Sequence, residues 1–145
     1  IKAKGFETYF LDVAKDNNAK ATEELENASL NFEIQETSGG IAPINDIFRD
    51  MELNVFRNQS SDLAAILEKE ISIGQNYLLK RNTGVNQANF YVLRFVEMPS
   101  VLIETAFISN PQENKIIKKS SFQEKIAECI YNGINNYLKV INKQK

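Results

Sequence analysis

The sequence predicts an α/β domain with a partial layered sheet and flanking helices. Three segments rich in aromatic and β-branched residues, at 5–11, 89–96 and 100–108, are typical of strands. Segments with apolar residues at spacings of three and four, typical of helices, lie between and after them. The 145 residues are 43% hydrophobic and 25% charged, as expected of a single domain spanning residues 1–145. Three strands are few for a sheet covered by helices, so we expect part of the sheet to be missing.

The strand at 5–11 is expected to lead through a polar turn into a helix. Ala, Glu, Lys and Leu dominate residues 19–30 and favour helix. The narrow apolar stripe of this helix consists of Ala21, Leu25 and Ala28. Residues 35–40 end in two glycines and interrupt the pattern.

Two separate helices are expected between residues 41 and 80. The first, over 41–55, is amphipathic and has Pro43 in its first turn, where a missing N–H costs little. Its apolar stripe comprises Ile41, Ile44, Phe48, Met51 and Val55. Ser60, Ser61 and Asp62 offer N-cap side chains for the second helix, which reaches about Lys80.

The last third of the chain predicts two strands and two helices. Pro99 separates the strand at 89–96 from the strand at 100–108, which is almost continuously apolar and is therefore expected to be buried on both faces. Asn110 as the cap and Pro111 at the first position predict the start of a helix. The final helix, over 122–141, carries a stripe of Phe122, Ile126, Ile130, Ile134, Leu138 and Ile141.

The chain contains no histidine, and this limits its chemistry. A Ser-His-Asp or Cys-His arrangement within the chain is excluded, and a self-contained catalytic zinc site is disfavoured. The formal net charge of −2 gives no reason to expect a nucleic-acid partner. No segment approaches the roughly 20 apolar residues of a membrane span. The single cysteine, Cys129, is expected to be a small core residue.

Glu104 is the leading catalytic candidate because it interrupts the most apolar strand. A carboxylate in such a place needs a partner, a metal or a raised pKa. The alternative is a structural carboxylate bonded to backbone or to a lysine. Asn86, Gln87 and Asn89 are candidates for substrate binding, since amides can hold a sugar or peptide by hydrogen bonds, but they are equally ordinary turn residues.

Three segments resemble the zinc-dependent N-acetylmuramoyl-L-alanine amidases of the Amidase_3 family. Residues 5–11 are similar to the strand that follows the family's second zinc histidine. Residues 81–94 resemble its central motif, and residues 98–111, around Glu104, resemble its most specific one. The final helix also fits, so the resemblance covers nearly the whole chain.

The resemblance implies an enzyme that hydrolyses the amide between the lactyl group of N-acetylmuramic acid and L-alanine of the peptidoglycan stem peptide. It assigns to Glu104 the role of general base beside a zinc-bound water. It also implies that two histidines and a glutamate hold the zinc in an N-terminal half that this chain lacks, so that no metal ligand lies in the chain itself. The chain alone is then expected to be inactive, and that N-terminal half is a possible partner.

The chain differs from simple family members by an insertion at about 27–60. This insertion resembles the regulatory segment of the cell-division amidases of Gram-negative envelopes, which covers the zinc site until an activator displaces it. The resemblance assigns a regulatory role to four residues of the 41–55 helix, Ile44, Phe48, Met51 and Glu52. The alternative interpretation is that this segment is an ordinary core helix. The resemblance therefore implies peptidoglycan as the substrate and an envelope protein as an activator. It also implies a periplasmic or extracellular location at the cell wall. The alternative function is a non-catalytic module that binds peptidoglycan or an envelope protein.

Overall fold

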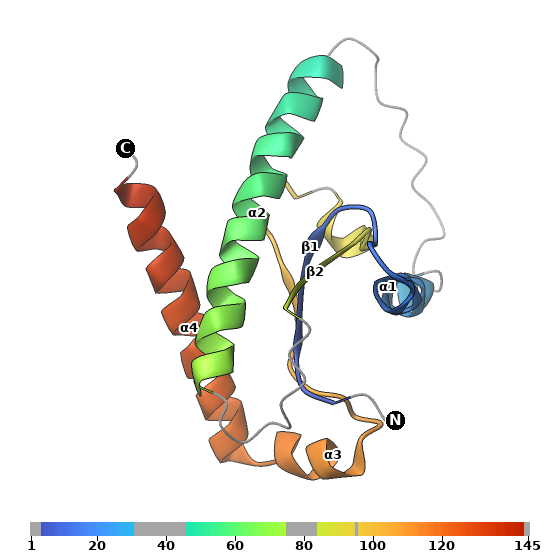
Figure 1. The fold of residues 1–145 in the computed structure, drawn as a ribbon, viewed down its shortest axis with the longest axis vertical. Coiled ribbons are helices and arrows are strands. Elements are labelled where there is room, and N and C mark those ends of the chain that lie inside the picture. The colour runs from blue at the N-terminus through green and yellow to red at the C-terminus, as the bar shows by residue number, and fades with distance from the viewer. Residues whose placement is uncertain (1–3, 31–45, 75–83, 95, 144–145) are drawn as a thin grey trace.

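The computed structural model describes residues 4–30, 46–74, 84–94 and 96–143, with side chains for all of these except 29–30 and 46–53 (Figure 1). In chain order the elements are β1 (Glu7–Leu11), α1 (Asn17–Leu30), α2 (Asp46–Gly74), β2 (Val85–Ala88), a 3-10 helix (Tyr91–Leu93), β3 (Leu102–Glu104), α3 (Pro111–Ile117) and α4 (Ser120–Asn142). None of the described helices is long and apolar enough to cross a membrane.

The described strands form one mixed sheet in the order β2-β1-β3. The central strand, β1, runs parallel to β2 and antiparallel to β3. Helix α1 lies on one face of this sheet, and α2 and α4 lie on the other (Figure 1). Since side chains alternate along a strand, Tyr9 packs with Ala19 of α1, whereas Phe6 packs with Ile71 of α2. The predicted α/β architecture with flanking helices is confirmed.

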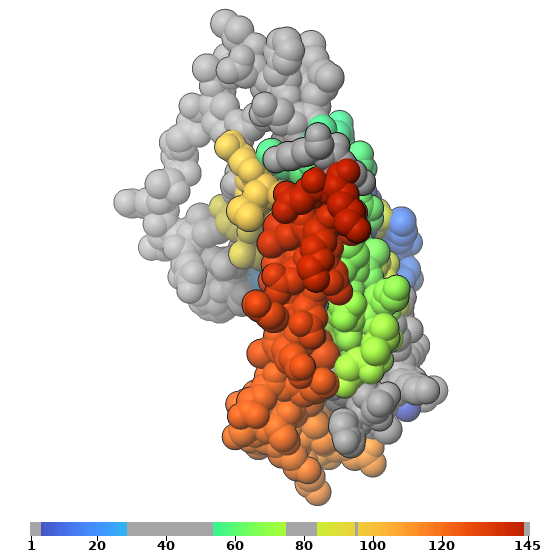
Figure 2. All heavy atoms as spheres, turned by 90° about the vertical axis from the view of Figure 1, so that its left-hand side faces the viewer, coloured from blue at the N-terminus to red at the C-terminus, as the bar shows by residue number. Residues whose placement is uncertain are grey.

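The long helices α2 and α4 pack against each other along much of their length (Figures 1 and 2). Leu63 and Leu67 of α2 form a buried cluster with Tyr137 of α4. Gly133 permits this approach, because a Cβ atom there would lie 2.7 Å from Cδ2 of Leu67. Cys129 is buried in the same layer, as the sequence predicts.

The helix stripes differ from those expected. The fully buried side of α4 carries Phe122, Ile126, Cys129, Gly133 and Tyr137, while Ile134 and Leu138 are exposed. A strict spacing of four rotates by about 40° at each step, so the predicted stripe leaves the buried face along a helix this long. On α1, Leu25 is 72% exposed and Ala19 is the residue that packs.

The strand predicted at 89–96 is wrong in position. The strand is β2, at Val85–Ala88, and the chain then turns into the 3-10 helix. Side chains of α1 take the backbone donors that would otherwise extend the ladder: Glu23 accepts from Asn89 N at 3.0 Å, and Asn27 Oδ1 accepts from Tyr91 N at 2.8 Å. A side-chain partner for these amides removes the reason to continue the strand.

The strand predicted at 100–108 is reduced to the three residues of β3, which are partly rather than fully buried. Within the described part of the chain β3 pairs on one side only, with β1. Leu102 packs on the α1 side and Ile103 on the side of α2 and α4, so both faces of this strand are covered, although none of its residues is fully buried.

The two helices predicted between 41 and 80 form one helix over its described length, α2. Ser60 does not cap a new helix: its hydroxyl donates to the carbonyl of Phe56 at 2.6 Å and accepts from Ser100 N at 2.9 Å. Serine can bond back to the carbonyl four residues earlier within a continuous helix. Neither Gly nor Pro interrupts residues 46–73, so the helix continues to Gly74.

Candidate active site

Glu104 is the last residue of β3 and lies directly opposite Glu7, the first residue of β1. Directly opposed residues of antiparallel strands have their side chains on the same face, with Cβ atoms about 4.5–5.5 Å apart. Ile103 packs on the side of α2 and α4, so Glu104, the next residue, faces the side of α1. The sheet thus presents two neighbouring carboxyl groups on its α1 face.

The surroundings of Glu104 favour its protonated form. Burial raises the pKa of Glu104 to about 7, and the negative charges of Glu7 and Glu26 act in the same direction. A carboxyl group with a pKa near neutrality can accept a proton in one step of a reaction and return it in the next. This property is suited to a general base, the role that the resemblance assigns to Glu104 and that stays a prediction.

Tyr9 is a core residue next to the carboxylate pair. It is 1% exposed, and its ring packs edge-to-face on Phe90 with centroids 5.2 Å apart. Its hydroxyl donates to the Glu7 carboxylate. Burial, followed by this hydrogen bond, raises the pKa of Tyr9, so the hydroxyl stays a donor at neutral pH.

The structure separates the three amides predicted to bind substrate. Asn86 pairs with Tyr9 in the parallel register, so it lies on the face that carries Glu104. Gln87 points to the other face, where its Nε2 donates to the carbonyl of Val13 at 2.7 Å. Oδ1 of Asn89 accepts from Nε of Arg94 at 3.0 Å. Substrate binding by these residues stays a prediction, and the geometry favours Asn86 among them.

Glu113, in the first turn of α3, is a buried carboxylate that was not among the candidate site residues. It is fully buried, and its carboxylate accepts from the backbone N–H of Gly5 at 2.5 Å and of Phe107 at 2.8 Å. Asn110 caps the same helix, as predicted, by accepting from Gln112 N at 3.0 Å. Glu113 therefore joins the segment that precedes β1 to the segment that follows β3, next to the carboxylate pair.

The predicted regulatory residues are only partly covered by the structure. Ile44 lies outside the described residues, and Phe48, Met51 and Glu52 lie in the first turns of α2, where side chains are not described. These turns continue into the part of α2 that packs on the sheet face opposite Glu104 (Figure 1). The expected position over Glu104 is therefore not observed for the described part of this segment.

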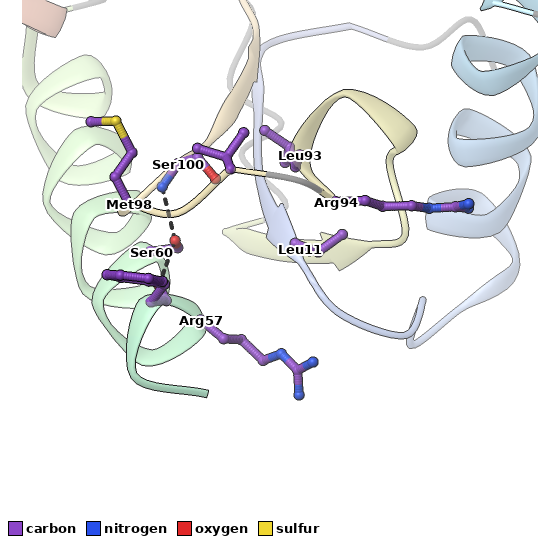
Figure 3. A pocket seen from close by; sticks show the side chains of 9 residues that line it. Leu11, Arg57, Ser60, Leu93, Arg94, Met98 and Ser100 are labelled. Carbon is purple, nitrogen blue, oxygen red and sulfur yellow. Dashed lines mark hydrogen bonds between the residues drawn. The ribbon is translucent and has the colours of Figure 1, made fainter. Parts of the chain in front are cut away.

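A small pocket lies at the other end of β1, around Leu11 (Figure 3). Its lining includes Phe56, Leu93 and Met98, and Ser60 bonds to Ser100 beside it. The guanidinium groups of Arg57 and Arg94 extend away from it (Figure 3). None of the described residues that line this pocket carries a carboxyl group, so the carboxylate pair is the better candidate for a general base.

The described residues do not by themselves fit a zinc ion. They contain no group of three or more His, Cys, Asp or Glu side chains placed to hold a metal. Structural and catalytic zinc sites use three or four such ligands.

Comparisons with known proteins agree with this architecture. N-acetylmuramoyl-L-alanine amidase AmiC of Neisseria meningitidis is 33% identical over 138 residues, which are 94% of this chain and 32% of that protein. AmiC of Escherichia coli is 44% identical over 73 residues, or 50% of this chain and 16% of that protein. The solved structure of the Clostridioides difficile CwlD amidase, in complex with the GerS lipoprotein, aligns with a TM-score of 0.56 at 25% identity, covering 96% of this chain and 48% of that one.

The fold is thus that of the N-acetylmuramoyl-L-alanine amidases, a class of peptidoglycan hydrolases. The family model for N-acetylmuramoyl-L-alanine amidases, Amidase_3, matches residues 1–136. The chain belongs to this family. It spans about half of the solved amidase chains and about a third of the Neisseria relative.

Proposed function

We propose that this chain forms the Glu104-bearing part of an enzyme that cleaves the amide between N-acetylmuramic acid and L-alanine of the stem peptide. One observation carries the proposal: a half-buried carboxyl group with a pKa raised to about 7 ends a strand of an amidase-family fold. For the isolated chain, the lack of histidine favours the alternative, a non-catalytic module that binds peptidoglycan or an envelope protein.

Amide hydrolysis requires two proton transfers that one carboxyl group can perform. Water attacks the lactyl carbonyl carbon, the carbon–nitrogen bond breaks, and the alanine amine leaves with a proton. Glu104, when ionised, removes a proton from the attacking water and then delivers it to the departing nitrogen. We propose that Asn86 holds a sugar or peptide group by its amide, a role that its position on the same sheet face supports.

Zinc in this enzyme would be held by residues outside this chain, as the resemblance of its motifs to the family implies. Its contribution would be to lower the pKa of the attacking water and polarise the carbonyl. Because peptidoglycan lies outside the cytoplasm, the proposed location is periplasmic or extracellular and cell-wall associated.

The function is tested by comparing the chain with the complete amidase that contains it. The complete protein should release muropeptides with a new alanine amine and lose this activity on zinc chelation. The chain alone should bind zinc weakly or not at all by calorimetry, because its described residues supply no three-ligand group. Tight stoichiometric zinc binding by residues 1–145 would contradict this account of the metal, and peptidoglycan binding without cleavage by the complete protein would support the binding module.

We propose that the insertion at 27–60 regulates access to the site. Its sequence resemblance to the regulatory segment of the cell-division amidases supports this proposal. Phe48→Ala should raise basal peptidoglycan cleavage by the complete enzyme without an activator. Losing a fully buried ring costs about 3–5 kcal/mol. Even half of this, if it applies to the closed state alone, raises the open population by well over tenfold.

Asn58→Ala is the matched control for this experiment, because Asn58 lies on the same helix, is exposed and is not part of the apolar stripe. It should leave basal activity unchanged. Unchanged activity in Phe48→Ala together with a large drop in melting temperature would identify the segment as ordinary core.

A further inference from the structure

Glu7 holds a place beside Glu104 that the hydrolytic scheme above does not use. The two residues are direct partners in the antiparallel register of β1 and β3, and both are partly buried. Like charges directly opposite on neighbouring strands destabilise a sheet. A pair of carboxyl groups at this position therefore calls for a reason beyond strand pairing.

The Glu7 carboxylate is fixed in its position by a donor from the core. The Tyr9 hydroxyl donates to one of its oxygens, and the Tyr9 ring is itself fixed by burial against Phe90. A hydrogen bond from a buried donor to an ionised group is stronger than a neutral one and limits its rotation. Glu7 is thus a negative charge held at one point rather than a free side chain.

The charges that act on Glu104 come from both elements on this side of the sheet. Glu7 lies on β1 and Glu26 lies on α1, and both oppose the ionisation of Glu104 after burial has done so. Of the two, Glu7 contributes the larger effect and is the direct strand partner. Glu24, two residues before Glu26, is exposed and is not among the causes.

We propose, on the basis of the function proposed above, that Glu7 is a positioning residue for Glu104. Its carboxylate, held by the Tyr9 hydroxyl, keeps the Glu104 carboxyl group protonated to higher pH and so lets it return a proton to the departing amine. Removing the charge of Glu7 makes Glu104 a weaker acid–base catalyst at neutral pH, although Glu7 never touches the substrate.

The direct test is a carbon-13 NMR titration of the Glu104 carboxyl in the chain of 145 residues. Glu7→Gln removes the charge and keeps an oxygen to accept from Tyr9, so it should lower the titration midpoint of Glu104 by about one pH unit. Glu7→Asp, which keeps the charge, should retain most of the raised midpoint. Glu24→Gln removes an exposed charge and should not move it.

The second readout is the pH profile of kcat/KM for the complete amidase. In Glu7→Gln the acid limb should move to lower pH, because the base ionises more easily. A midpoint and an acid limb that stay unchanged in Glu7→Gln overturn the proposal, even if melting temperature falls. If Glu7→Gln does not fold, Glu7→Thr removes the same charge with a residue suited to a strand and must give the same shift.

This design separates the inference from the function on which it rests. If Glu7→Gln does not lower the titration midpoint of Glu104 while Glu104→Gln abolishes activity, only the role of Glu7 is refuted. If Glu7→Gln lowers that midpoint while Glu104→Gln keeps full activity, the proposed catalytic role of Glu104 is refuted instead.

Discussion

Replacing Glu104 by Gln in the complete amidase should lower turnover of peptidoglycan by about 10²–10⁴-fold. Glutamine keeps the shape of the side chain but cannot take a proton from water, so binding is retained and the chemical step is lost. The measurement is dye release from labelled peptidoglycan, with zinc content determined in parallel. Glu97→Gln is the matched control, since Glu97 is exposed near the same strand and should leave turnover unchanged.

The pH dependence of the parent enzyme follows from the same carboxyl group. Because the pKa of Glu104 is raised to about 7, the base is protonated and inactive below that pH, and kcat/KM should rise as pH increases through it. A flat profile between pH 5 and 8, or a Gln variant that cleaves at the parental rate, would make Glu104 a structural residue.

A stability measurement distinguishes loss of the catalytic group in Glu104→Gln from loss of folding. A folded-state pKa above the unfolded value means that the stability contributed by the protonated carboxyl is present below the unfolded pKa and is lost as pH rises through about 7. Gln stays neutral at every pH. Glu104→Gln should therefore be at least as stable as the parent at pH 8, measured by urea unfolding, while its activity is lost.

The architecture was predictable because it depends on patterns that persist along the chain. The β-rich run at the start, the helical spacing in 122–141 and the Asn110 cap each act through neighbouring residues, and each gives the expected element. Strand limits were not predictable in the same way. Asn89 and Tyr91 lie in a β-favouring run, but their amides are bonded by Glu23 and Asn27, about sixty residues away in sequence.

The candidate site likewise combines features that local sequence patterns predict with features that depend on distant residues. Glu104 was identifiable because a carboxylate interrupts an apolar run. Its pairing with Glu7 depends on the register of two strands nearly a hundred residues apart, which no local pattern specifies. For Glu7 the available signal was an acidic residue within an aromatic strand, and for Glu113 it was only a position in a first helical turn.

Glu113→Ala is expected to destabilise the chain strongly. The carboxylate is fully buried and accepts from two backbone N–H groups, those of Gly5 and Phe107. Hydrogen bonds to a charged group contribute about 1.5–3 kcal/mol each, and their buried donors would be left without this acceptor. We therefore expect the free energy of unfolding to fall by about 3–5 kcal/mol in urea titrations followed by circular dichroism.

Gln112→Ala is the control, because Gln112 is exposed on the same turn of α3 and should change stability by less than about 0.5 kcal/mol. Glu113→Gln should fall between the two, since its amide oxygen can accept from one N–H group but not from both.

Loss of the Glu113 carboxylate should also affect the candidate active site. Gly5 lies two residues before Glu7, and Phe107 lies three residues after Glu104, so a loosened Glu113 junction should lower activity below the melting temperature as well. A Glu113→Ala variant as stable as the parent would show that these two backbone groups find other acceptors.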